Sequence, residues 1–128
     1  MAASSPLRIA GSQEPSEVID DAHLARMTLG DQALEREVLE IFLRQATLMI
    51  ERIEGAEPGL AAAAAHTLTG SARGVGAWRV AQAAERLEQA AGHASEAALD
   101  EAVDALKAAT VEAGAAINVR LGKALREH

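Results

Sequence analysis

Apolar residues recur at three- and four-residue steps along most of the chain from residue 18 onward, which is the spacing of amphipathic helices. The pattern predicts a short helix over about residues 19–27, with Asp20 or Asp21 near its N-terminus, and a long helix that Asp31 caps and that ends at about Glu54. The apolar stripe of the long helix consists of Leu34, Val38, Ile41, Phe42, Met49 and Ile53, widened by Leu39, Leu43, Ala46 and Ile50. A stripe of this width predicts contact with more than one neighbouring helix.

Three more helices are predicted, each bounded by proline, glycine or serine. Pro58 suits the first turn of a helix that runs through His66 to about Gly74, and Gly76 completes the turn that follows. The next helix, from Ala77 to about Ala91, has its inner face at Val80, Ala84, Leu87 and Ala91 and ends at Gly92. Ser95 is predicted to cap a last helix whose apolar positions are Leu99, Val103, Leu106, Val111, Ile117, Leu121 and Leu125. Because short connections favour antiparallel neighbours, the predicted fold is all-α: an up-and-down antiparallel four-helix bundle with a short extra N-terminal helix.

Length and composition agree with one helical domain. The chain has 128 residues, of which 49% are apolar, and about half of these are alanine, so its helices must pack closely. Strand-forming residues are scarce, with one Phe, one Trp and no Tyr. Residues 1–16 contain two prolines and no sustained apolar period, so we expect a flexible leader there and the helical bundle over residues 17–128.

Charge and residue usage exclude several classes of function. The net charge of −7 disfavours binding to nucleic acid, and the absence of cysteine excludes disulfides, thiolate catalysis and cysteine-based zinc sites. His23, His93 and His128 lack the spacing of metal ligands, so no metal site is expected. The longest apolar run, residues 60–65, is far shorter than the roughly 18 residues of a membrane span, so we expect a cytoplasmic protein with no membrane segment.

One histidine is predicted to face away from the core. At about 100° per residue, the side of the helix opposite His66 carries Leu60, Ala61, Ala64, Leu68, Ser71, Ala72 and Val75. The face of His66 itself holds Ala62, Gly70 and Arg73, with Thr69 beside it. Glycine inside a helix costs roughly 1 kcal/mol relative to alanine, so Gly70 indicates that something approaches closely there. A neutral imidazole is a competent nucleophile, although an exposed histidine can equally be a solvated residue without a role.

Residues 66–77, HTLTGSARGVGA, resemble the signature of histidine phosphotransfer domains. That signature reads His, any residue, Leu, Lys, Gly, two positions of Ser or Ala, two variable positions, an aliphatic residue, Gly, and a small or aliphatic residue. The segments 39–45 and 83–88 stand where this family has neighbouring bundle helices, so the resemblance covers about residues 18–125.

The resemblance implies a phosphorelay intermediate in two-component signal transduction. His66 would accept a phosphoryl group from an aspartate of one receiver domain and pass it to an aspartate of another, and Gly70 would clear its flank. The implied partners are receiver domains of hybrid histidine kinases and of response regulators. Mg²⁺ would belong to the receiver, so this chain is expected to need no cofactor and to have no kinase activity of its own; a GxxxxGK[ST] phosphate loop is absent. The implied docking residues are Leu24, Met27, Ala62, Ala63 and Ala77, although Leu24 and Met27 can also be assigned to covering the core.

Two positions depart from the family pattern. Thr69 replaces the lysine that follows the histidine by three residues, and we hypothesise that Arg73 supplies the missing positive charge. Glu88 stands where many family members have a glutamine that bonds the imidazole; its carboxylate could fix the tautomer of His66 or repel an incoming phosphate. Two alternatives therefore stay open: a related bundle that binds a receiver or kinase without carrying phosphate, and a plain helical adaptor. The single accessible histidine favours a monomer, although the long last helix could support a dimer.

Overall fold

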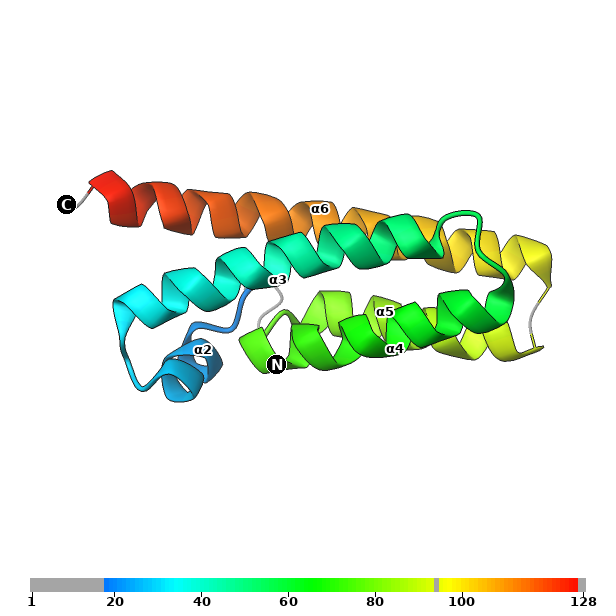
Figure 1. The fold of residues 1–128 in the computed structure, drawn as a ribbon, viewed down its shortest axis with the longest axis horizontal. Helices are drawn as coiled ribbons and strands as arrows, with labels where there is room; N and C mark the ends of the chain where they lie inside the picture. Colours follow the sequence, from blue (N-terminus) through cyan, green and yellow to red (C-terminus); the bar gives the residue numbers. More distant parts are fainter. Residues whose placement is uncertain (1–17, 94, 127–128) are drawn as a thin grey trace, which may run out of the picture.

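The computed structural model describes residues 18–93 and 95–126 of the chain. These ranges contain five helices. They are α2 (Asp21–Thr28), α3 (Gln32–Ile53), α4 (Pro58–Val75), α5 (Trp78–His93) and α6 (Glu96–Arg126). The four long helices alternate in direction and lie side by side, while α2 packs at one end of the bundle (Figure 1). The predicted all-α antiparallel bundle is confirmed, and the described ranges contain no strand. The expected leader, residues 1–16, lies outside the described residues.

The helix starts follow the local signals in the sequence. Asp31 caps α3, and its Oδ1 accepts a hydrogen bond of 3.0 Å from the backbone N–H of Leu34. Pro58 occupies the first turn of α4, and the Ser95 hydroxyl accepts 3.1 Å from the backbone N–H of Ala98 at the start of α6. Helix α5 continues through Gly92 to His93, two residues beyond the predicted end at about Ala91. No helix in the described ranges has the length and apolar character needed to span a membrane.

The core lies between the helices and is built from a few large side chains and many alanines. The largest fully buried side chains are Phe42, Leu24, Leu39, Leu68, Leu87, Leu106, Ile117 and Val80. Three apolar residues of α3 and α6 assigned to inner faces lie at the surface instead: Leu34, Ile41 and Val111 are 39%, 46% and 72% exposed. For Val111 the reason is geometric, because five residues after buried Leu106 correspond to about 140° around the helix axis. Leu34 and Ile41 lie at the edge of the stripe that α3 buries, which follows the residues Leu39, Phe42, Ala46, Met49 and Ile53.

Helix α2 is held to the turn between α4 and α5 by Asp20. The Asp20 backbone N–H donates 3.0 Å to the carbonyl of Gly76, and its carboxylate accepts 3.1 Å from the backbone N–H of His23 and 2.9 Å from Trp78 Nε1. Gly76 has φ of 81°, and an added Cβ would lie 3.0 Å from the Cβ of Asp20, so only glycine fits this contact. The hydrogen bonds from Trp78 and from the His23 backbone hold the pKa of Asp20 below its usual value of 3.8.

We expect Asp20→Ala to lower the free energy of unfolding at neutral pH by about 1–2 kcal/mol, because it removes a helix cap and the bond to Trp78. The lowered pKa in the folded state means that this stabilisation is complete above the unfolded pKa of about 3.9 and is lost as pH falls through the folded pKa. Urea unfolding followed by circular dichroism from pH 7 to pH 2.5 measures both effects. Asp31→Ala, which removes one cap bond from α3, is the matched control and should cost less. A wild-type advantage over Asp20→Ala that stays constant down to pH 2.5 would contradict this account.

Candidate functional site

His66 projects from the middle of α4 into solvent. Its side chain is 80% exposed, whereas its helix neighbours Ala65 and Leu68 are fully buried. The orientation predicted from helical periodicity is therefore confirmed for His66. Leu60 was expected on the buried side, but it is 66% exposed because it lies about 100° around the helix from buried Ala61.

A side chain of α5 holds the imidazole of His66 on the inner side of the ring. His66 Nδ1 lies 3.1 Å from Oε1 of Glu88 on α5, and the other carboxylate oxygen of Glu88, Oε2, lies 3.1 Å from the Thr69 hydroxyl. The Thr69 hydroxyl is also 2.9 Å from the carbonyl of Ala65, and its single proton can be donated to one of these acceptors at a time. Thr69 is 5% exposed and the Glu88 side chain 27%, so both support the ring from its inner side.

This anchoring selects which nitrogen of the ring can react. A carboxylate can only accept a hydrogen bond, so the contact with Glu88 requires the proton of neutral His66 on Nδ1. The Nε2 lone pair is then left free on a ring that is open to solvent. The arrangement presents one nucleophilic nitrogen to solvent and keeps the other occupied.

The outer face around His66 carries little that would obstruct a partner. Gly70 is exposed one turn after His66, and a Cβ added there would meet nothing within 4 Å. The fold itself therefore gives no reason for glycine at this position. Arg73 is half-exposed and its Nη2 donates 3.0 Å to Oε2 of Glu85, so its guanidinium is already paired within the chain.

Two residues assigned to partner docking are buried. Leu24 is 1% exposed, on the buried side of α2, and Ala77 is fully buried at the turn where its backbone N–H donates to the carbonyl of Ala72. Neither can touch a partner, so the docking assignment is wrong for both. Met27 is 56% exposed, Ala63 is exposed and Ala62 is half-exposed, so these three stay available.

A surface groove lies beside His66, and the sequence analysis does not predict it. It has a volume of about 380 Å³ between α3 and α4 and is lined by Met49, Arg52, Leu60, Ala63, Ala64 and Thr67. By helical steps, Ala63 and Thr67 lie on one side of His66 and Thr69 on the other, so the groove and Glu88 flank the ring on opposite sides. The exposed row Leu60, Ala63 and Thr67, at three- and four-residue steps, was the signal available in the sequence.

The described ranges contain no group of three or more His, Asp or Glu side chains placed to hold a metal ion. The side chains of His93 and His128, which were not expected to bind metal, lie outside the described residues. His23 is described, and its ring packs edge-on against Trp78 with the ring centroids 5.0 Å apart. Its place in the fold is therefore the contact between α2 and α5.

Comparison with known proteins gives two matches. The family model described as Hpt domain matches residues 37–116. The crystal structure of the histidine phosphotransferase ShpA from Caulobacter crescentus is similar at 34% sequence identity, with a TM-score of 0.59, over 84% of this chain and 98% of that one. No curated protein sequence matches the chain.

We expect Glu88→Ala to shift the neutral imidazole of His66 away from the Nδ1–H tautomer, because the acceptor for that proton is lost. A net hydrogen bond of about 1 kcal/mol corresponds to a change of roughly fivefold in the tautomer ratio. The ring ¹⁵N chemical shifts of His66 measure this ratio directly. Glu85→Ala, one turn earlier on α5, removes a carboxylate that bonds Arg73 and should leave the ratio unchanged. Equal ratios in wild type and Glu88→Ala would show that Glu88 does not set the tautomer.

Proposed function

Because the chain belongs to the histidine phosphotransfer (Hpt) domain family, we propose that it carries a phosphoryl group on His66 between aspartates of receiver domains. The family has a phosphorelay role in two-component signalling, in which its members are phosphocarriers that interact with receiver domains. The observation that carries the assignment to His66 is the exposed ring whose Nδ1 is bonded to Glu88.

In the proposed transfer, the Nε2 lone pair of His66 attacks the phosphorus of a receiver aspartyl phosphate. The new N–P bond forms as the P–O bond to the aspartate breaks, and the aspartate leaves with that electron pair as a carboxylate. The Nδ1 proton stays on the ring, which becomes positively charged, and Glu88 stabilises this charge from the inner side. Transfer to the next receiver is the same step in reverse, and Mg²⁺ is supplied by the receiver in both directions.

Because the family's lysine is missing, another residue of the site must supply a positive charge to the phosphoryl group. Thr69 bonds Glu88 and Ala65 behind the ring, so we assign it to positioning the carboxylate and not to contact with the phosphoryl group. Arg73 follows His66 by two turns on the same face, and in this proposal it exchanges Glu85 for the phosphoryl oxygens when the receiver docks. The docking surface then comprises Ala62, Ala63 and Gly70 around His66, the groove beside Leu60 and Thr67, and Met27 on α2.

A bundle that binds a receiver without carrying phosphate is the second candidate. Two observations favour it: the family's lysine is replaced by a buried threonine, and a carboxylate stands beside the imidazole. Both functions use the same surface, so only the chemistry at His66 separates them.

Incubation with a phosphorylated receiver domain should transfer phosphate to the wild-type protein as an acid-labile, alkali-stable adduct. His66→Gln should abolish the adduct while circular dichroism shows an intact fold, because His66 is exposed and supports no core contact. His128→Gln removes one histidine elsewhere in the sequence and should have no effect. Receiver binding without an adduct would replace this proposal by the second candidate, and no binding at all would refute both.

We expect Gly70→Ala to stabilise the fold by about 0.5–1 kcal/mol and to slow transfer by roughly tenfold. The methyl group meets nothing within the chain but would occupy the space into which the receiver must come. Gly114→Ala on α6 is the matched control, because its Cβ would make ordinary contact with Leu43 of α3 and lies away from His66. Thermal unfolding and single-turnover transfer measure the two effects. A Gly70→Ala protein that transfers at the wild-type rate would show that no close approach occurs there.

A further inference from the structure

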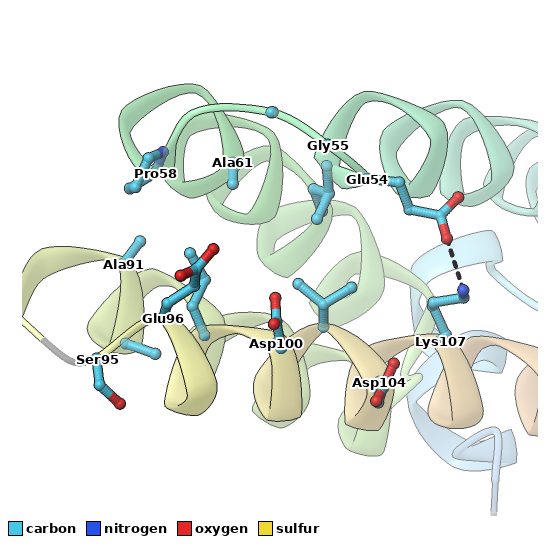
Figure 2. A pocket seen from close by; sticks show the side chains of 15 residues that line it. Glu54, Gly55, Pro58, Ala61, Ala91, Ser95, Glu96, Asp100, Asp104 and Lys107 are labelled. Atoms are coloured by element: carbon cyan, nitrogen blue, oxygen red, sulfur yellow. Dashed lines mark hydrogen bonds and ion pairs between the residues drawn. The ribbon is translucent and has the colours of Figure 1, made fainter.

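A second groove opens at the end of the bundle away from α2 and carries no part of the phosphotransfer site. It has a volume of about 780 Å³ and lies between the connection from α3 to α4 and the first turns of α6 (Figure 2). We call it the end groove. Its base is formed by buried Ile53 and Ala61, and the half-buried side chains of Leu99 and Val103 on α6 complete its apolar lining.

The end groove exists because the side chains around it are too small to fill it. Ala61, Ala90 and Ala91 line it from α4 and α5, and in the described residues the α-carbons of α4 and α6 stay more than 8 Å apart. Leu99 and Val103 therefore keep apolar surface open to solvent at the entrance. A groove of this volume is within the range of ligand sites in proteins.

The rim of the end groove is negatively charged. Glu96, Asp100 and Asp104 follow one another at four-residue steps on α6, and Figure 2 shows Glu96 and Asp100 directed toward the connection that carries Gly55 and Pro58. Like charges at this spacing repel each other, and the helix dipole favours only Glu96, which is in the first turn. Asp104 attracts Lys107 three residues later, so the stability of α6 accounts for Glu96 and Asp104 but not for Asp100.

The positive charge at the end groove is already engaged. Lys107 Nζ lies 2.5 Å from Oε2 of Glu54, and this hydrogen bond raises the pKa of Lys107. The lining residues comprise four carboxylates, with Glu54 the fourth, against the single ammonium of Lys107. The end groove therefore combines an apolar base with a net negative rim, which is complementary to a segment that is apolar on one side and basic on the other.

We propose that the end groove binds a basic amphipathic helix of a partner protein. Its apolar side chains would cover Leu99 and Val103, and its lysines or arginines would pair with Glu96 and Asp100. The groove extends along α6 from Ser95 to Lys107, which at 1.5 Å per residue is roughly 18 Å, or about three turns of a bound helix.

This binding is independent of phosphotransfer at His66. Ala61, in the base of the end groove, precedes His66 by five residues and therefore points about 140° away from it around α4. A receiver docked over His66 leaves the end groove free. A partner bound there could keep the protein in place while receivers exchange at His66.

Titration of the ¹⁵N-labelled protein with a 14-residue leucine–lysine peptide of amphipathic helical pattern tests the proposal. We expect saturable 1:1 binding, with the largest amide shifts at Ala56, Ala91 and Leu99 and none centred on His66. A peptide with the same lysines and serine in place of leucine should bind at least about tenfold more weakly, because it cannot cover the apolar base.

Variants separate the local charges from the net charge of the protein. Glu96→Gln combined with Asp100→Asn should weaken binding of the leucine–lysine peptide about fivefold, whereas Glu37→Gln combined with Glu40→Gln, on exposed positions of α3, should not. Ala91→Leu should fill the groove and abolish binding while circular dichroism shows an intact bundle. Both rim substitutions should leave phosphoryl transfer at His66 unchanged, so this test is decided separately from that of the carrier function.

Three results would overturn the proposal. One is equal affinity for the leucine and serine peptides, which would indicate attraction to the net charge alone. Another is equal weakening by the α3 control pair, and the third is unchanged binding in Ala91→Leu.

Discussion

The close approach of α4 and α5 is the constraint on which the site depends. These two helices share the most extensive interface in the bundle. By helical periodicity, buried alanines lie on the facing sides: Ala65 and Ala72 on the Thr69 side of α4, and Ala81 and Ala84 on the same side of α5 as Glu88. The distance between packed helices is set by the side chains at their contact. Larger residues would move α5 outward. The carboxylate of Glu88 would then no longer reach the solvent-facing ring of His66. The many alanines make the core side chains small, and they also let α5 come close enough for Glu88 to accept a hydrogen bond from His66.

Glu88 brings two opposing electrostatic effects to the proposed transfer, and the geometry favours attraction. The carboxylate is bonded to Nδ1, on the inner side of the ring, while the phosphoryl group would be attached to Nε2 on the outer side. The positive charge of the phosphorylated ring is thus closer to Glu88 than the phosphoryl oxygens are. Distance and solvent screening favour attraction to the ring, whereas the phosphoryl group carries up to about two negative charges against the single positive charge of the ring. A glutamine at this position could accept the same proton but would not stabilise the charge as strongly.

The features that the sequence predicted correctly depend on residues close together in the chain. Asp31, Pro58 and Ser95 mark helix starts through contacts within one turn, and the orientation of His66 follows from the periodicity of α4 alone. The incorrect predictions concern tertiary contacts, that is, which helix or turn packs against a given surface. Leu24 and Ala77 are buried because α2 folds back against the turn at Gly76, and Leu60 is exposed because no helix of the described ranges covers that edge of α4. The bond between Thr69 and Glu88 links two helices, so its geometry could not be derived from either helix alone; only the spacing implied by the family resemblance pointed to Glu88.

In the proposed function, few residues of this chain take part in the reaction, so selectivity between receivers depends on how they dock. A single exposed imidazole with a carboxylate behind it would be equally reactive toward any receiver aspartyl phosphate, since the reacting carboxylate and the metal belong to the receiver. In the proposed function, discrimination would come from surfaces outside the reacting atoms, and the surfaces proposed for docking are the groove along Leu60 and Thr67 and the exposed part of α2. Such surfaces cannot be optimised for one receiver alone if the same face must release it and accept another. A second binding site at the far end of the bundle would relieve this conflict, because it could hold one partner tightly without slowing the exchange of receivers at His66.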